Sequence, residues 1–410
     1  MTKPNNKPDF DIIIVGGGMV GMAAALSLSQ LNLSIALLES QVAEGNSHPS
    51  YDDRTLVVNQ ASVNFWKNLG IWQKLKQNIT PINKVHVSNK GHFGSVVFDK
   101  DELNVNALAY IVEAKILGFA LKHACEENES ITIIAPASFK QMQHKKKSIE
   151  VDYTVGESIH TISAKLMLAA DGIQSGVRQQ LGLETIIKSY QRTAIICNIT
   201  PEQKHNNCAF ERLTDKGPTA ILPFVSNRCG FVWTVENAQS QEILDLSDED
   251  FIQKAQQQFG YRLGKFIKAG KRSSYPLYLV TVPKQVKNRV ILIGNAAHGM
   301  SPVSAQGLNL AVRDVARLFD VLQEIIQKSQ DIGADESLNT YQNAINTDQQ
   351  QTMRYTDDLM SWFKIDEPLI ATLRSISLFA MNQSKHLKQE LFHRASGYRG
   401  QIPQLLRKKA

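Results

Sequence analysis

Residues 11–21 read Asp-Ile-Ile-Ile-Val-Gly-Gly-Gly-Met-Val-Gly, and this stretch decides the fold. Its start, Ile12–Val15, is apolar and rich in β-branched residues, which predicts a buried strand of a parallel sheet. Glycines with the spacing Gly-x-Gly-x-x-Gly follow the strand, and small apolar residues of helical composition follow the glycines. Together they predict a dinucleotide site, because the unpaired amides at the start of such a helix bind the diphosphate.

Each residue of this turn has an expected task. Gly16 permits the tight turn, Gly18 lets backbone amides approach a diphosphate, and Gly21 lets the helix pack closely against the strand. Met19 and Val20 begin the helix, and we expect them to contact the cofactor as well. The alternative is an ordinary strand–helix turn without a ligand.

The second predicted strand, Ile35–Leu38, leads to a carboxylate that suits a ribose. Glu39 stands where an acidic residue accepts hydrogen bonds from a ribose hydroxyl in this type of site. We expect its neighbour Ser40 to take part. Arg54 follows closely enough to reach a cofactor phosphate or the adenosine; the alternative is a surface ion pair with one of the two preceding aspartates.

The bulk composition is that of a globular protein. The chain has 410 residues, of which 43% are hydrophobic and 20% charged, and its net charge is +6. No apolar run approaches the roughly 18 residues of a transmembrane helix, and the polar first residues lack the apolar centre of a signal peptide. The four cysteines are widely spaced. We therefore expect a cytoplasmic protein with reduced thiols and no metal site.

Two further predicted strands end in short glycine-containing turns. The strand Lys165–Ala170 leads into Asp171-Gly172, and the strand Val290–Ile293 leads into Gly294-Asn295. Ligands of open α/β sheets bind beyond the carboxyl ends of the strands. We therefore expect these two turns to face the same ligand as the first.

The pattern between these strands changes, which indicates an inserted domain. Runs at 193–199, 220–224 and 229–234 read as antiparallel strands, while helices are predicted over 111–124 and 248–259. We predict a mixed α/β (α+β) protein in three parts. A discontinuous, Rossmann-like nucleotide-binding domain takes residues 9–80, 100–185 and 286–330, a substrate-side sheet takes 81–99 and 186–285, and a helical region takes 331–410.

The three turns in this order resemble the class A flavoprotein aromatic hydroxylases, which have the para-hydroxybenzoate hydroxylase fold. Within that class, Pro302-Val-Ser-Ala-Gln-Gly-Leu-Asn-Leu-Ala-Val-Arg-Asp314 resembles the signature of the ubiquinone-biosynthesis hydroxylases. Further stretches are similar to one branch of that family, the 2-octaprenyl-6-methoxyphenol hydroxylases. They are Tyr51-Asp-Asp-Arg-Thr55, His86-Val-Ser-Asn-Lys-Gly-His92, Phe210-Glu-Arg-Leu-Thr-Asp-Lys-Gly-Pro218, and Arg262-Leu-Gly-Lys265 with Gly270-Lys-Arg-Ser-Ser-Tyr-Pro276.

The resemblance implies a complete chemistry. FAD would be the dinucleotide, NAD(P)H a transient reductant and O2 a cosubstrate, with a flavin C4a-hydroperoxide that hydroxylates an electron-rich ring. The implied substrate is a polyprenylated phenol of ubiquinone biosynthesis, and the implied reaction is hydroxylation of a 2-polyprenyl-6-methoxyphenol. The cofactor carries this chemistry, so no nucleophilic triad is required.

The resemblance also assigns residues to parts of the cofactor. Asp171, Gly172, Gly294 and Asn295 would hold the ribityl and diphosphate groups. Glu113 is a further candidate near the ribityl chain, and a solvated glutamate at a helix start is the alternative. Helix-start amides would stabilise the negative charge of the reduced flavin. The residues expected at the flavin ring are Pro302, Ala305, Gln306, Gly307, Leu308 and Asn309.

The chain departs from the family pattern at four positions. Asn295 replaces an aspartate, and its carbonyl can still accept a hydrogen bond from a ribityl hydroxyl. Ser301 replaces a histidine. Ala305 and Ala311 replace glycines, so these positions either have negative φ or carry strain.

Two pairs of alternatives remain open near the reacting ring. His298 could donate a proton, and the alternative is a histidine packed beside the diphosphate loop. Pro223 and Phe224 could form a wall of the substrate pocket, and the alternative is the end of an ordinary core strand.

The end of the chain is basic, with seven Lys/Arg residues and one acid from Lys385 onward. A polyprenyl phenol dissolves in bilayers, so a basic, amphipathic C-terminal region suits peripheral contact with the inner face of a membrane or with a ubiquinone-biosynthesis complex. Packed helices with a solvated basic end are the alternative, and no nucleic acid is expected. The rival functions are another FAD oxidoreductase on the same fold and a flavin-binding subunit without turnover.

Overall fold

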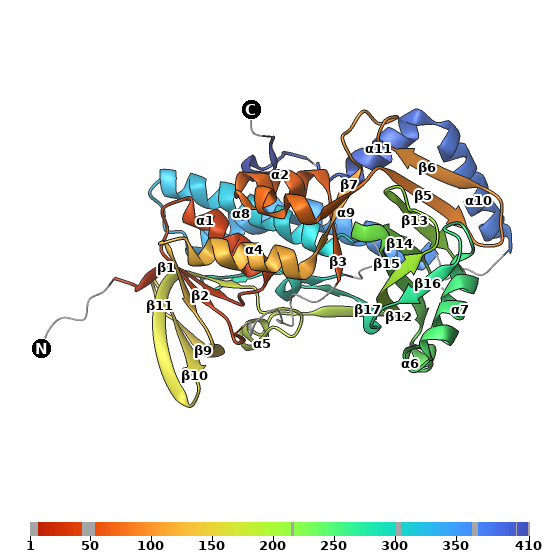
Figure 1. Ribbon diagram of the computed structural model, residues 1–410. Coiled ribbons are helices and arrows are strands. Elements are labelled where there is room, and N and C mark those ends of the chain that lie inside the picture. The colour runs from red at the N-terminus through yellow and green to blue at the C-terminus, as the bar shows by residue number, and fades with distance from the viewer. Residues whose placement is uncertain are drawn as a thin grey trace, which may run out of the picture.

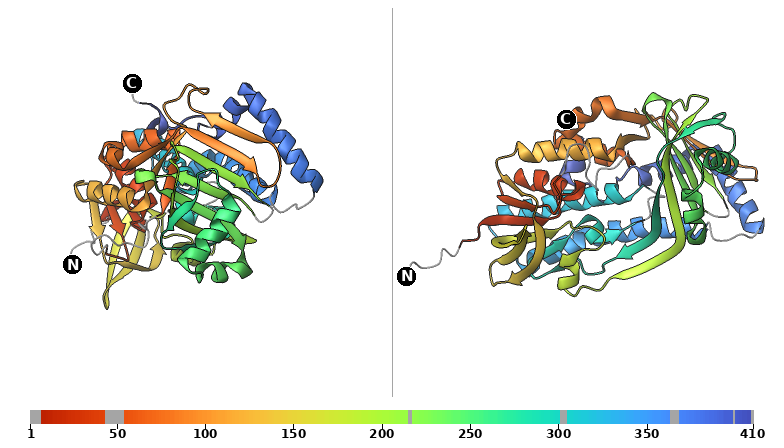
Figure 2. Two further views of the ribbon diagram at one scale, coloured as in Figure 1. Left: turned by 45° about the vertical axis from the view of Figure 1, so that its right-hand side comes forward. Right: turned by 60° about the horizontal axis from the view of Figure 1, so that its bottom comes forward.

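A computed structural model describes residues 7–42, 54–214, 217–300, 305–362, 368–398 and 400–408. Two large sheets stand side by side, each covered by helices, and a small third sheet lies between them (Figure 1). The long strand β12 (Ile186–Pro201) runs from the first half of the molecule into the second (Figure 2). The expected mixture of a parallel and an antiparallel sheet is therefore present.

The first sheet is built from strands that are far apart in sequence. In the order β19-β11-β1-β2-β8, neighbouring strands are parallel. An antiparallel pair, β9 and β10, extends from β11, and β18 lies at the other edge. The strands are β1 (Phe10–Val15), β2 (Ile35–Leu38), β8 (Ile131–Ile134), β9 (Ser138–His144), β10 (Ile149–Val155), β11 (Ser158–Ala169), β18 (Val286–Lys287) and β19 (Val290–Leu292).

Alternating side chains of β1 are buried on both faces of this sheet, which explains its apolar sequence. Ile12 and Ile14 pack against the helices α1 (Met19–Ser29), α4 (Ala114–Glu126) and α8 (Gly307–Gln327). Ile13 and Val15 pack against β10 and the short helix α5 (Gly176–Gln180).

The second sheet has the order β20-β17-β12-β15-β14-β13-β5-β6, with β16 beside β12. Its pairs are antiparallel except β13 with β5, which are parallel. Its outer face packs against α7 (Asp248–Phe259), and α6 (Asn237–Leu244) lies next to β12. The strands are β5 (Lys84–Asn89), β6 (Ser95–Asp99), β12, β13 (Cys208–Leu213), β14 (Thr219–Pro223), β15 (Cys229–Glu236), β16 (Phe266–Ala269), β17 (Ser273–Thr281) and β20 (His298–Gly299).

The small sheet has the order β3-β7-β4 and connects the two halves. Its strands are β3 (Thr55–Val58), β4 (Ile79–Ile82) and β7 (Ala109–Glu113), and the helices α2 (Gln60–Asn68) and α3 (Ile71–Leu75) lie between β3 and β4 in sequence. The helix predicted over 111–124 starts too early. Residues up to Glu113 pair with β3 and β4, and α4 begins at Ala114.

The C-terminal region packs against both halves. The helix α9 (Asp335–Trp362) lies along α8 and β18, while α10 (Pro368–Gln383) covers β5 and β6, followed by α11 (Lys385–Ala395). A short 3-10 helix, Gln404–Leu406, packs against α2 and α8, with Leu405 and Leu406 buried. This segment of the basic end is therefore part of the core, although the sequence suggested a solvated or membrane-bound tail.

Candidate functional site

Gly16 and Gly21 of the first glycine turn have no room for a side chain. Gly16 has φ +107°, and a Cβ there would lie 2.4 Å from the carbonyl oxygen of Ala170. A Cβ on Gly21 would lie 1.9 Å from the carbonyl oxygen of Gly16. Gly18 is the N-cap of α1 and has φ −69° and ψ 178°, a conformation that any residue can adopt. The missing side chain of Gly18 therefore matters because it keeps open the space in front of this residue.

That space is a cavity of about 390 Å³ at the carboxyl edge of the parallel sheet. The first and second glycine turns and the end of β2 meet there. Its lining includes six of the predicted cofactor residues: Gly16, Gly18, Glu39, Ser40, Asp171 and Gly172. The structure thus brings together residues that are more than one hundred positions apart in sequence.

Glu39 is held in this cavity by backbone amides. The N–H of Gly17 donates to Oε2 of Glu39 at 2.7 Å, and the N–H of Gln41 donates to Oε1 at 2.8 Å. The carboxylate is therefore oriented toward the glycine turn, at the edge of the cavity. Its contact with a ribose stays a prediction.

Asp171 carries an acceptor that suits a ligand. Its Oδ2 accepts a hydrogen bond from the N–H of Val177 at 3.2 Å. Its Oδ1 is buried, and within the described part of the chain no donor reaches it. Buried polar atoms usually have a partner, so this oxygen fits a hydroxyl of a bound cofactor. The neighbouring Gly172 has φ +86°.

The third turn comes close to the first. Gly294 has φ +57°, and a Cβ there would lie 3.0 Å from Cγ1 of Val20 on α1. The side chain of Asn295 is exposed at the end of β19. Met19 and Val20 begin α1 beside this turn and are half-buried. Their direct contacts with a cofactor stay predictions.

Arg178 connects the second and third turns, a role that the sequence did not reveal. Its Nη1 donates to the carbonyl oxygen of Ala296 at 2.9 Å, and its Nη2 donates to that of Ile173 at 2.6 Å. The side chain is buried. The only signal in the sequence is its position seven residues after Asp171, on the helix that follows the turn.

The start of α8 combines a strained residue with open space. Ala305 has φ +50°, so the substitution of the family glycine is accommodated in the left-handed region, with strain. Ala311 lies inside α8, where φ is negative. No described atom lies within 4 Å of the place where a Cβ on Gly307 would stand. Pro302 and Ser301 lie outside the described residues.

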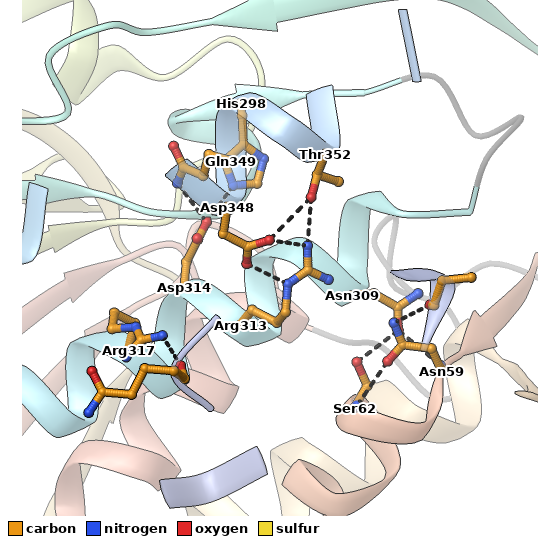
Figure 3. A network of polar contacts seen from close by, with 12 residues as sticks. Asn59, Ser62, His298, Asn309, Arg313, Asp314, Arg317, Asp348, Gln349 and Thr352 are labelled. Carbon is orange, nitrogen blue, oxygen red and sulfur yellow. Dashed lines mark hydrogen bonds and ion pairs between the residues drawn. The ribbon is translucent and has the colours of Figure 1, made fainter. Parts of the chain in front are cut away.

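The side chain of Asn309 is occupied by protein contacts (Figure 3). Its Nδ2 donates to the carbonyl oxygens of Val57 and Ala305, both at 2.8 Å, and its Oδ1 accepts from Asn59 N–H and Ser62 Oγ. A contact with the flavin would therefore come from its backbone amide. The same applies to Gly307 and Leu308, since the first amides of a helix lack partners within it. Gln306 is the N-cap of this helix and makes no capping bond.

His298 belongs to a buried network that joins β20, α8 and α9 (Figure 3). Its Nε2 lies 2.6 Å from Oδ2 of Asp314, which also accepts from Nε2 of Gln349 at 2.9 Å. Both His298 and Asp314 are nearly inaccessible. Next to them, Arg313 of α8 donates to Asp348 of α9. These contacts hold His298 between β20, α8 and α9, and both roles considered for it stay predictions.

Arg54 and Glu113, which are among the predicted cofactor residues outside the lining of the cavity, contact other side chains. The guanidinium of Arg54 lies over the ring of Tyr275 on β17, 4.9 Å from its centroid. Glu113 pairs with Lys115 at 3.2 Å and with Arg228 at 3.7 Å. Their roles at the cofactor stay predictions, and these contacts place both beside the second sheet.

The two pocket-wall candidates are core residues in this structure. Phe224 is buried among Ile82, Leu108 and Ile111 of the region between the sheets, and the guanidinium of Arg228 stacks on its ring. Pro223 is buried at the end of β14. A role in binding the substrate stays a prediction for both.

Comparisons with known proteins show the family of the chain. A family model described as FAD binding domain matches residues 9–356, so the chain belongs to this family of FAD-binding flavoproteins. The chain is 30% identical to the ubiquinone hydroxylase UbiL of Rhodospirillum rubrum over 94% of its length and 89% of that protein. It is 28% identical to the 3-demethoxyubiquinol 3-hydroxylase of Escherichia coli, over 96% of its length and 99% of the relative.

Solved structures support the fold. The p-nitrophenol 4-monooxygenase PnpA of Pseudomonas putida superimposes with a TM-score of 0.78 at 15% identity, covering 95% of this chain and 99% of that one. The anhydrotetracycline hydroxylase OxyS of Streptomyces rimosus gives 0.74 at 17% identity, covering 96% and 77%. The predicted class, an FAD-dependent monooxygenase related to the ubiquinone-biosynthesis hydroxylases, is confirmed.

Proposed function

We propose that this enzyme hydroxylates the ring of a polyprenylated phenol in ubiquinone biosynthesis, with 2-polyprenyl-6-methoxyphenol as its substrate. The relatives that carry the family assignment are ubiquinone hydroxylases. NAD(P)H would reduce the flavin, and O2 would supply the oxygen atom.

One observation carries the choice of substrate. The stretches that resemble the methoxyphenol hydroxylase branch meet on the second sheet, although they come from distant parts of the chain. His86 on β5 pairs with Phe210 on β13, and Arg54 lies over Tyr275. The pKa of His86 is lowered mainly by burial and, to a smaller extent, by the charge of Arg262. Features specific to the branch thus gather on the second sheet.

The protein residues bind and orient the reactants. FAD, when bound, supplies the redox and oxygen chemistry. Gly16, Gly18 and Gly21 give a diphosphate access to the amides at the start of α1, and Asp171 offers its free oxygen to a hydroxyl. The start of α8 would direct its unpaired amides toward the flavin ring, where they favour negative charge.

The test is turnover by the purified holoprotein. With 2-polyprenyl-6-methoxyphenol, NAD(P)H and O2 consumption should rise, and mass spectrometry should find a product one oxygen atom heavier. A Gly18→Val protein, expected to lack FAD, is the matched control. A holoprotein that is inert toward every prenylphenol would overturn the proposal in favour of a subunit without turnover. Flavin reduction without ring oxidation would point to another oxidoreductase.

We also propose that the outer face of α10 contacts an anionic membrane surface. Leu373, Ile376 and Phe379 follow each other at helical spacing and are 61%, 47% and 54% exposed. The exposed Lys385 and Leu387 follow at the start of α11. Apolar side chains beside basic ones favour binding at the interface of anionic bilayers. No helix among the described residues is long and apolar enough to span a bilayer.

Flotation with vesicles tests this contact. Replacing Leu373, Ile376 and Phe379 by serine should abolish flotation with anionic vesicles and leave FAD content unchanged. The matched control replaces Ile159 and Ile187, which are 55% and 66% exposed on other elements. Equal flotation of the triple variant and the wild type would contradict the proposal.

A further inference from the structure

Glu211 is a carboxyl on the inner face of the second sheet. Residues of β13 alternate between the two faces, and Phe210 packs into the outer core against α7. Ala209 and Leu213, two positions before and after Glu211, pack into clusters on the opposite, inner face. The side chain of Glu211 therefore points toward the half of the molecule that binds the cofactor.

Apolar elements enclose the place where Glu211 lies. Ala209 packs against β4 and β7 of the small sheet, and Leu213 packs against Leu378 of α10. The cross-strand neighbours of Glu211 are Val87 and Ala220. Beyond Ala220 in the same row, Val232 packs beside Met360 of α9. Val87, Glu211, Ala220 and Val232 thus form a row across the inner face of the sheet, and Glu211 is its acidic member. We call the other three residues the apolar row; β4, α10 and α9 border it.

The carboxyl is deep but still accessible. Burial alone raises the pKa of Glu211 to about 8. The residue nevertheless keeps part of its surface open, since it is only half-buried by accessible area. Since burial is the one cause of the shift, no described hydrogen bond or charge contributes to it.

The charged side chains on the surrounding elements have other contacts. Arg54 lies over Tyr275, Arg228 pairs with Glu113, and Lys388 of α11 pairs with Glu102 at 2.5 Å. Arg374 of α10 is buried and does not lower the pKa of Glu211. None of the described hydrogen bonds or ion pairs involves the side chain of Glu211, so its partly accessible carboxyl is available to a ligand with a hydroxyl group.

We propose that Glu211 binds the ring hydroxyl of the phenol substrate and accepts its proton. The phenol O–H bond breaks and a carboxyl O–H bond forms, while the electron pair stays on the phenol oxygen and makes the ring more electron-rich. The proton passes from Glu211 to water when the product leaves. The apolar row beside Glu211 receives the ring. This inference rests on the proposed function and names the group that prepares its substrate.

The raised pKa of Glu211 suits a base that takes a proton from a phenol. A phenol resembling tyrosine has a pKa of about 10, and a general base works best when its own pKa lies near the working pH. An ordinary glutamate, with a pKa of about 4.5, would be a much weaker base toward a phenol.

The experiment compares holoprotein of the wild type, Glu211→Gln and Glu236→Gln. Glu236 lies on β15, where its exposed carboxylate pairs with Arg192. We expect Glu211→Gln to retain FAD and to lower kcat/KM for hydroxylation about 10²-fold. In the wild type, kcat/KM should rise with pH around 8. In Glu211→Gln this rise should move toward the pKa of the phenol itself, and Glu236→Gln should match the wild type.

A second readout does not require turnover. The ultraviolet difference spectrum of the bound phenol should shift to longer wavelength in the wild type above pH 8, where the phenol donates to the ionised Glu211, and should lack this shift in Glu211→Gln. Phenolate stays a minor species, because the pKa of a phenol, about 10, lies above that of Glu211. An unchanged pH profile and an unchanged spectrum in Glu211→Gln would overturn this inference while the proposed function stands. A wild type that forms no hydroxylated product, yet shows the Glu211-dependent spectral shift of the bound phenol, would overturn the proposed function alone.

Discussion

Gly18 and Gly21 belong to one sequence motif, but substituting them should affect different properties of the protein. Gly18 has extended backbone angles and lines the cavity, so Gly18→Val should fold and lose FAD. In Gly21→Ala the new Cβ would meet the carbonyl oxygen of Gly16, so this variant should lose several kcal/mol of stability, as in severe overpacking. Flavin absorbance and thermal unfolding separate the two. Normal flavin content in Gly18→Val would contradict the placement of the diphosphate.

Ala305 should be more stable as glycine. A non-glycine residue in the left-handed region costs about 1–2 kcal/mol, and part of this is offset because glycine is more flexible when unfolded. Ala305→Gly should therefore raise the free energy of unfolding by about 0.5–1 kcal/mol. Ala311→Gly is the matched control, since its position inside α8 predicts a loss of about 1 kcal/mol. Urea unfolding measures both, and a destabilised Ala305→Gly would show that this residue is not strained.

The ionisation of Glu211 should appear in the stability of the protein. Its pKa is about 8 in the folded protein, above the ordinary 4.5, so the folded state binds the proton more tightly. Stability is then fully present below the unfolded pKa and falls as pH rises toward 8. Glu211→Gln lacks this loss and should gain on the wild type from about pH 4.5 to about pH 8, by at most about 1.4 kcal/mol per pH unit. If the curves of melting temperature against pH were parallel for the wild type and Glu211→Gln, the raised pKa of Glu211 would be contradicted.

At the scale of elements, Arg178 should hold two cofactor turns in place. Two different nitrogens of its guanidinium donate to the two carbonyl oxygens, a fork that lysine lacks. Losing a charge-assisted hydrogen bond costs about 1.5–3 kcal/mol. We expect Arg178→Lys to weaken FAD binding roughly tenfold, since tenfold corresponds to about 1.4 kcal/mol. Arg192→Lys, which changes the partly exposed ion pair with Glu236, serves as the control. Equal FAD affinities of the two variants would contradict this role of Arg178.

Elements whose signals are local could be predicted from the sequence. The helix expected over 248–259 is α7, capped by Ser247 and starting with three acidic residues. The apolar parallel strands were equally clear, because both faces of that sheet are buried. The small sheet was missed because β3 and β4 have four residues each and form through distant pairing. Glu211 was missed for a related reason, since its burial depends on α9, α10 and β4 together.

At the scale of the whole molecule, the order of three glycine turns predicted the discontinuous arrangement of the chain. The parallel sheet indeed takes strands from both sides of the second sheet in sequence. The role of the C-terminal segment could not be predicted, since its basic composition is that of a solvated tail. Only the fold shows that its leucines complete the core around α2.

Removing residues 403–410 should therefore destabilise the entire nucleotide-binding half. Leu405 and Leu406 are buried, and burial of a leucine contributes about 1.5–3 kcal/mol. Asn64 and Asn68 would also lose acceptors, the carbonyl oxygens of residues 405–407. We expect a loss of about 3–6 kcal/mol, twice the value for one leucine, with reduced FAD content. The triple serine variant of α10 should melt like the wild type, because its residues are exposed. A truncated protein with unchanged melting temperature would mean that this segment is a tail after all.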